Sequence, residues 1–135
     1  MMTIFRASVL SLSVLVLSLA GCAKTGPQRY DHWGKITYRG QPIPKGVINF
    51  DPDLGAGNDG PQGFAEIENG QFDTRKRPLC GPGSGKYVMQ VFAADGVVGP
   101  EAPLGKPMFK SQVSIQADLE SKDGELDLVI PDNTR

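Results

Sequence analysis

The stretch from Gly34 to Phe50 decides the fold and reads GKITYRGQPIPKGVINF. Apolar residues alternate with polar ones in both halves, with Ile36 and Tyr38 in the first half and Ile48 in the second. An alternation of period two is typical of half-buried strands. The glycines and prolines between the halves favour a rigid turn. The stretch therefore predicts two strands, each with one face in a hydrophobic core.

Five further alternating segments follow at regular spacing, and they cover residues 64–68, 71–73, 86–92, 112–116 and 125–130. The dipeptide Asn69-Gly70 separates two of them and accepts the positive φ angles of a type I′ hairpin. Seven short strands in about 100 residues are typical of an antiparallel β-sandwich, so we predict an all-β fold. The predicted core consists of the apolar residues that alternate inward: Ile36, Tyr38, Ile48, Phe50, Ile67, Phe72, Tyr87, Met89, Val91, Val113, Ile115, Leu126 and Leu128.

The first long connection, residues 51–62, reads DPDLGAGNDGPQ. Asp51, Asp53, Asn58 and Asp59 supply side-chain oxygens of the kind that calcium prefers. Their spacing misses the EF-hand pattern, because Gly and Gln stand where two of the ligands belong. A solvated turn is therefore the favoured interpretation, with a calcium site as the alternative.

The second long connection covers residues 93–110 and contains three prolines. Its length predicts a segment that crosses between two sheets, with Phe109 or Met108 tucked beneath it. Binding modules often place their specificity in such loops. Both connections are therefore candidate ligand-binding loops.

The amino-terminal region predicts export. An apolar run from Ala7 to Leu19 follows the basic Arg6 and is too short to span a membrane, so it is typical of a secretory signal. The run ends in Leu19-Ala20-Gly21-Cys22, which resembles the lipobox of bacterial lipoproteins. The resemblance implies cleavage between Gly21 and Cys22, and acyl chains on the thiol and on the new amino terminus of Cys22.

This resemblance implies a membrane-anchored protein of the cell envelope. Each buried methylene of an acyl chain contributes about 0.8 kcal/mol, and several chains together give a lasting anchor. Ala23 follows the lipidated cysteine, where enterobacterial sorting uses Asp for inner-membrane retention, so outer-membrane delivery on the periplasmic face is implied. We assign residues 1–21 to the signal peptide, 22–32 to a flexible tether and 33–135 to one β-sandwich domain.

The predicted strands also resemble those of the carboxypeptidase regulatory-like, or transthyretin-like, β-sandwich domains. Those domains commonly begin Gly-x-Val-x-Tyr-x-Gly-x-Pro-Val-x-x-Gly-x-Val-x-Phe, which the stretch from Gly34 to Phe50 follows. Residues 67–72 and 86–92 match the hairpin and the later Tyr-x-Val-x-Val strand of the family in part, with Met89 at the first Val position. Such domains usually act as non-catalytic accessory modules, and the resemblance implies that role here.

The composition argues against several kinds of chemistry. The net charge is −1, which does not favour nucleic acid as a partner. His32 is the single histidine, so histidine-based nucleophile pairs and multi-histidine zinc sites lack their residues. Ser84 lacks the Gly-x-Ser-x-Gly setting of a hydrolase nucleophile. We therefore predict no catalytic residues, no cofactor and no metal.

Three further residue groups have structural interpretations. Cys80 has no intramolecular disulfide partner once Cys22 is lipidated, and it is expected to be a small, buried or half-buried apolar residue. The alternative is a reactive thiol, since the basic residues Arg75 to Arg77 precede it. Trp33 is expected to cap one end of the sandwich. Arg75 to Arg77 are expected to lie in a solvated loop, with a basic docking point for an acidic partner or a glycan as the alternative.

The sequence thus predicts a membrane-anchored, non-catalytic lipoprotein whose β-sandwich is an interaction module for another envelope protein. The alternative is a ligand-binding module for envelope glycan, peptide or calcium through residues 51–62 and 93–110. An enzyme of unknown type is the third hypothesis.

Overall fold

The computed structural model describes residues 26–132, so the predicted signal peptide and Cys22 lie outside the described residues. Within this range the chain is all-β, as predicted, and contains no helix long and apolar enough to cross a membrane. The strands are β1 (His32–Tyr38), β2 (Gln41–Pro42), β3 (Lys45–Pro52), β4 (Gly63–Glu68), β5 (Gln71–Asp73), β6 (Gly85–Ala94), β7 (Val113–Leu119), β8 (Gly124–Glu125) and β9 (Leu128–Ile130). Two single-turn 3-10 helices, η1 (Leu54–Ala56) and η2 (Thr74–Lys76), lie in the connections.

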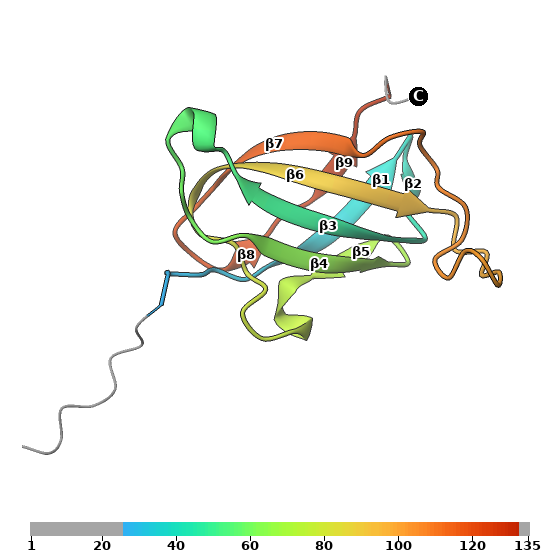
Figure 1. Cartoon of the computed structure of the whole chain (residues 1–135), viewed down its shortest axis with the longest axis horizontal. Helices are drawn as coiled ribbons and strands as arrows, with labels where there is room; N and C mark the ends of the chain where they lie inside the picture. Colours follow the sequence, from blue (N-terminus) through green and yellow to red (C-terminus); the bar gives the residue numbers. More distant parts are fainter. Residues whose placement is uncertain (1–25, 133–135) are drawn as a thin grey trace, which may run out of the picture.

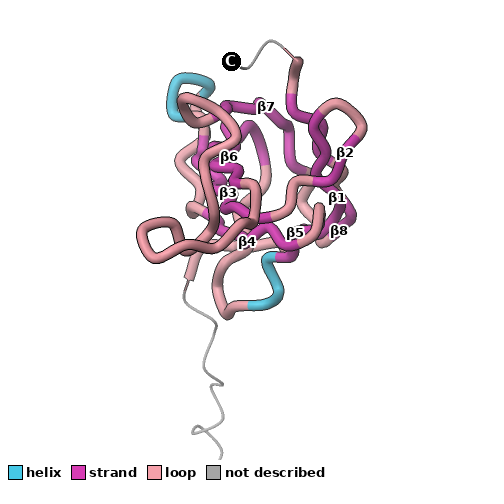
Figure 2. Tube along the Cα trace, turned by 90° about the vertical axis from the view of Figure 1, so that its right-hand side faces the viewer, coloured by secondary structure: helices cyan, strands magenta, loops and turns pink. Residues whose placement is uncertain are grey.

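The strands form one curled sheet with hydrogen-bonded neighbours in the order β1-β5-β4-β3-β6-β7, and β2, β8 and β9 each pair with β1 (Figure 1). All neighbours along this path are antiparallel, whereas β8 and β9 run parallel to β1. Figure 2, seen along the strands, shows how the sheet curls round on itself. The curl encloses the apolar side chains that alternate inward along each strand.

The core matches the predicted one closely. Of the predicted residues, Tyr38, Ile115 and Leu126 pack against its margin, and the others are buried. Ile43 is a buried core residue that the prediction omitted, because it stands between two prolines and interrupts the alternation. Its N–H donates to the Ile36 carbonyl at 3.2 Å, and its carbonyl accepts the Gly70 N–H at 2.7 Å. The other additions to the core are Ala65, Ala93, Ala94, Leu119 and Ile130.

The predicted hairpin around Asn69-Gly70 is confirmed. It joins β4 to β5 in the register Ile67↔Phe72. Both turn residues have positive φ, 50° for Asn69 and 74° for Gly70. A Cβ at Gly70 would collide with Pro42 of the neighbouring turn, so the position requires glycine on steric grounds as well.

The prediction for residues 93–110 is wrong in one respect. This connection does not cross between sheets, because β6 and β7, which it joins, are antiparallel neighbours over the register Gly85↔Leu119 to Val91↔Val113. Residues 93–110 are therefore the long loop of a β-hairpin formed by β6 and β7. The predicted strand 125–130 is also divided, into β8 and β9. Between them, the Asp127 side chain rather than a backbone carbonyl accepts the hydrogen bond from the Lys35 N–H of β1, at 2.9 Å.

The amino-terminal end of the domain also differs from expectation. Trp33 does not cap an end of the fold but lies within β1, where the Arg75 guanidinium carbon is 3.8 Å from its ring centroid. The preceding residues pack on the domain as well. Arg29 Nη1 donates to the carbonyls of Gln62 and Gly81 at 2.7 and 2.8 Å, and the Tyr30 N–H donates to the Pro82 carbonyl at 2.8 Å. Arg29 to His32, part of the segment assigned to the tether, therefore pack on the domain.

Tyr87 gives a direct test of this packing. Its ring is 1% exposed, and its hydroxyl accepts the Gly83 N–H and donates to the Pro61 carbonyl, both at 2.8 Å. Tyr87→Phe should lower the free energy of unfolding by about 1–2 kcal/mol, because it removes the hydroxyl partner of the buried Gly83 N–H and of the partly buried Pro61 carbonyl. Tyr87→Ala should cost about 3 kcal/mol or more. Urea denaturation of both variants measures these losses, and a loss below about 0.5 kcal/mol for Tyr87→Ala would place the ring outside the core.

Candidate functional site

The oxygen-bearing side chains of residues 51–62 bond mainly within the fold. Asp53 caps η1 by accepting the Ala56 N–H at 3.1 Å, and Asp51 accepts the Gln62 amide at 2.8 Å. Asn58 Nδ2 donates to the Lys86 carbonyl at 2.7 Å. Among residues 26–132, no group of three or more His, Cys, Asp or Glu side chains is placed to hold a metal ion. The loop is thus a hydrogen-bonded turn beside the start of β6.

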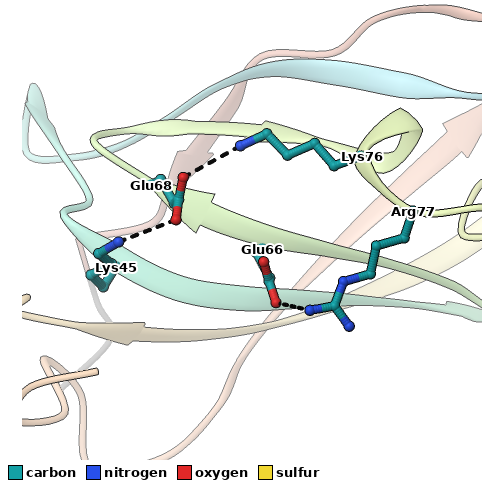
Figure 3. A network of polar contacts seen from close by, with 5 residues as sticks. All are labelled: Lys45, Glu66, Glu68, Lys76 and Arg77. Atoms are coloured by element: carbon teal, nitrogen blue, oxygen red, sulfur yellow. Dashed lines mark hydrogen bonds and ion pairs between the residues drawn. The ribbon is translucent and has the colours of Figure 1, made fainter. Parts of the chain in front are cut away.

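The basic residues Arg75 to Arg77 form ion pairs with carboxylates on the outer face of the sheet. Figure 3 shows the pairs of Lys76 and Arg77. Lys76 pairs with Glu68 at 3.5 Å, and Arg77 pairs with Glu66. Arg75 pairs with Asp73 at 2.8 Å. These pairings leave the segment without an excess of positive charge. Cys80, which follows, is half-buried as predicted.

The Lys45 ammonium donates to Glu68 at 3.2 Å and lowers the pKa of that carboxyl from its ordinary value. Lys76, on the other side of Glu68, acts in the same direction. The hydrogen bond from Arg75 lowers the pKa of the Asp73 carboxyl in the same way. These carboxylates are exposed or nearly so, and each such pair contributes little to stability because water screens it.

The connection between β6 and β7 projects from the sheet as a folded arm, which we call the finger and define as residues 95–108. It is visible at the right of Figure 1, beyond the end of β6. Backbone hydrogen bonds run across its base, from Asp95 to the Lys106 carbonyl at 3.0 Å and from Met108 to the Ala93 carbonyl at 2.9 Å. At its tip, Gly99 and Ala102 exchange a pair of hydrogen bonds at 3.1 Å.

Side-chain contacts stiffen the finger further. The Asp95 carboxylate accepts the N–H groups of Val97 and Lys106, both at 2.9 Å. Gly105 adopts a φ of 95° and approaches this carboxylate too closely for a Cβ. Just beyond the finger, the ring of Phe109 packs edge-on against Tyr38, with centroids 4.9 Å apart, which confirms the predicted position under the connection. Three prolines also limit the conformations of the unbound loop.

The finger exposes apolar side chains beside its tip and along its length. Val97 is 71% exposed and Val98 is 70% exposed, while Leu104 and Met108 are 36% and 38% exposed. A long loop without internal bonding could fold such side chains inward, but the hydrogen bonds of the finger hold them out. The finger is therefore a preorganised apolar projection.

The finger lies far from the point where the chain enters the domain. Arg29 and Tyr30 bond to Gly81 and Pro82, next to the start of β6, whereas the finger follows the end of β6. A strand of ten residues spans about 30 Å. The entering chain and the finger accordingly stand at opposite ends of the long axis of the domain in Figure 1.

His32 is a buried polar residue that the sequence pattern placed in the tether. It is 5% exposed, and its Nε2 has no hydrogen-bonding partner among the described residues. Burial lowers the pKa of the imidazole from its ordinary value of 6.5. A hydrogen bond to the Gly124 carbonyl and the negative charges of Asp123 and Asp31 act in the opposite direction but are outweighed. The backbone N–H of His32 donates to the Thr74 hydroxyl at 3.0 Å, and that hydroxyl donates to the Asp31 carboxylate at 2.8 Å. This cluster joins the start of β1 to η2 and β8.

The lowered pKa of His32 predicts a pH dependence of stability. Because the folded state favours the neutral imidazole, the stabilisation is complete above pH 6.5, the unfolded value, and is lost as the pH falls below it towards the folded pKa. The carboxyls with lowered pKa, Glu68, Asp73 and Glu120, lose their contributions only below their ordinary values of 4.5, 3.8 and 4.5. Thermal unfolding between pH 7.5 and pH 5 should thus show a fall in Tm that His32→Gln removes. An unchanged slope in His32→Gln would contradict this assignment.

No protein-family model, curated protein or solved structure matches the chain, so its function must be argued from its sequence and geometry.

Proposed function

We propose that the chain is an exported, lipid-anchored interaction module of the cell envelope, whose finger binds an apolar groove on a partner protein. The supporting observation is the finger itself, a hydrogen-bonded arm that holds Val97 and Val98 in water at more than two-thirds exposure. The chain end that carries Leu19-Ala20-Gly21-Cys22 supports the anchor. On this proposal the curled sheet is a sandwich of the carboxypeptidase regulatory-like type.

The energetics of the finger favour a binding role. Full burial of a Val side chain contributes about 1.5–3 kcal/mol, and in the free protein neither Val97 nor Val98 gains it. Because the finger is already ordered by its backbone bonds and by Asp95, binding costs little conformational entropy. A convex apolar tip on a stiff arm fits a concave apolar surface.

Two features favour a protein over the lipid bilayer as the occupant of the tip. Glu101 is exposed in the turn between Gly99 and Ala102, beside the valines, and a carboxylate is costly in hydrocarbon. The position of the finger also favours a protein partner over the bilayer. With the lipid on Cys22, the segment before Arg29 spans at most about 25 Å, which keeps the entry end of the domain near the membrane. The finger, about 30 Å further along β6, can then reach outward.

The proposal assigns no catalytic role to the candidate nucleophiles Ser84 and Cys80. Within residues 26–132, no hydrogen bond joins His32 to Ser84 or Cys80, and His32 Nε2 is shielded from solvent. The Cys80 thiol is free and half-buried. Among the described residues, neither candidate nucleophile is thus hydrogen-bonded to a histidine base.

The double variant Val97→Asp/Val98→Asp tests the finger. After crosslinking in intact native cells and affinity capture, the wild-type chain should bring down one recurrent envelope protein, and the double variant should lose it. Its Tm should stay close to that of the wild type, because exposed substitutions usually change stability by less than about 0.5 kcal/mol. Mass spectrometry compares the proteins captured with the wild-type chain and with the double variant.

Two controls complete this experiment. Val129→Asp places the same charge on another exposed valine, 68% exposed on β9, and should keep the partner. Cys22→Ala should accumulate as an unprocessed precursor. Retention of the partner by the double variant would remove the finger from the proposal, and a mature, membrane-bound Cys22→Ala chain would remove the lipid anchor.

A further inference from the structure

A second feature, separate from the finger, is a hollow of about 330 Å³ on the outer face of β3 and β4, where the 78–81 segment folds back beside β4. Its lining comes from both strands and from that segment: Asn49, Asp51, Gln62, Gly63, Phe64, Leu79 and Cys80. The core residues Ile48 and Phe50 alternate with Asn49 and Asp51, so the latter two point outward. The volume is at the small end of ligand sites.

The wall of the hollow is firmly held. The Phe64 N–H donates to the Cys80 carbonyl at 2.8 Å, which fixes the 78–81 segment against β4. Arg29 Nη1 bridges the carbonyls of Gln62 and Gly81 at 2.7 and 2.8 Å on the same side. A Cβ at Gly63 would lie 2.8 Å from Pro82, so this close approach requires glycine. The hollow is therefore a fixed feature of the fold.

Leu79 is the unusual residue at this site. Its φ is 60°, a left-handed conformation that costs free energy for any side chain with a Cβ. Its side chain is also 80% exposed, so burial in the core does not offset the unfavourable backbone conformation. This turn residue holds an exposed apolar side chain at the rim of the hollow, where it is available to contact a ligand.

The polar groups of the hollow lie next to one another across two strands. Asn49 is paired with Phe64 in the sheet register, and the Gln62 amide donates to Asp51 Oδ1 at 2.8 Å. The second oxygen of Asp51 therefore remains available as an acceptor. Among the described residues, the Asn49 amide has no hydrogen-bonding partner and offers both a donor and an acceptor. The lining thus combines an aromatic ring and an aliphatic side chain with adjacent carboxylate and amide groups.

We propose that this hollow binds a neutral saccharide, with the C–H face of a sugar ring on Phe64 and Leu79 and its hydroxyls bonded to Asn49 and Asp51. An anionic ligand is disfavoured because the Asp51 carboxylate carries the only formal charge among the lining side chains. The nearest cation, the Arg77 guanidinium, lies 5.6 Å from the centroid of the Phe64 ring and is paired with Glu66. A wholly apolar ligand would leave Asp51 and Asn49 desolvated and unpaired. A sugar ring meets both requirements, since hydroxyls surround its edge while its faces carry C–H groups.

The test is an NMR titration of the full chain, in a detergent without a sugar headgroup, with cellobiose, maltose and di-N-acetylchitobiose as probes. At least one probe should give saturable backbone shifts around Asn49, Phe64 and Leu79, with a Kd below about 10 mM. Asn49→Ala and Asp51→Asn should each weaken that binding about tenfold, through the loss of a hydrogen bond or of a charged acceptor. Asp51→Asn keeps an oxygen for the Gln62 bond and so preserves the wall.

Gln116→Ala is the matched control, because Gln116 is an exposed amide on the same sheet face, on β7, outside the hollow. It should bind the probe like the wild type. The absence of saturable shifts with all three probes would overturn the proposal, as would shifts that both site variants retain. The finger lies outside the hollow, so a failure here leaves the proposed partner binding unaffected, and the reverse also holds.

Discussion

Strand β1 is hydrogen-bonded along both of its edges, and the rest of the fold depends on this arrangement. One edge carries β5 and then β2, while the other carries β8 and then β9. The first strand of the domain is thereby placed between the central hairpin and the last residues of the chain. An unpaired buried backbone group costs about as much as a lost hydrogen bond, so both edges must be satisfied together. With both edges of β1 paired, the curled sheet surrounds the core, and His32 at the start of β1 is buried.

The same arrangement determines how the domain presents its surfaces. Because β1 is held on both sides, the chain enters the domain at a fixed point, where Arg29 bridges the carbonyls of Gln62 and Gly81. That point adjoins the start of β6, and the finger extends from its other end. A long, paired strand thus separates the end attached to the proposed anchor from the apolar tip. The hollow beside Phe64 lies near the entry end, so the two candidate surfaces can act independently.

The alternation of apolar residues predicted most of the fold, since Ile48, Phe50, Met89 and similar residues repeat with period two regardless of their partners. Pairing could not be predicted in this way. The parallel contact of β9 with β1 depends on Asp127 replacing a backbone partner, which no periodic pattern contains. The length of residues 93–110 suggested a crossover because Asp95 and Gly105, which fold the finger back on itself, are ordinary loop residues in sequence. The hollow escaped prediction because Asn49 and Asp51 gain their neighbours only through the strand register.

The central claim is that the finger tip contacts a protein partner. The most direct measurement places a photo-crosslinking amino acid at position 98 of the full chain in native cells and compares it with the same residue at position 129. The account predicts a single protein adduct at position 98 that is absent at position 129, with the crosslinked partner peptide rich in apolar residues. Adducts to lipid alone at position 98, or the same adducts at both positions, would contradict it.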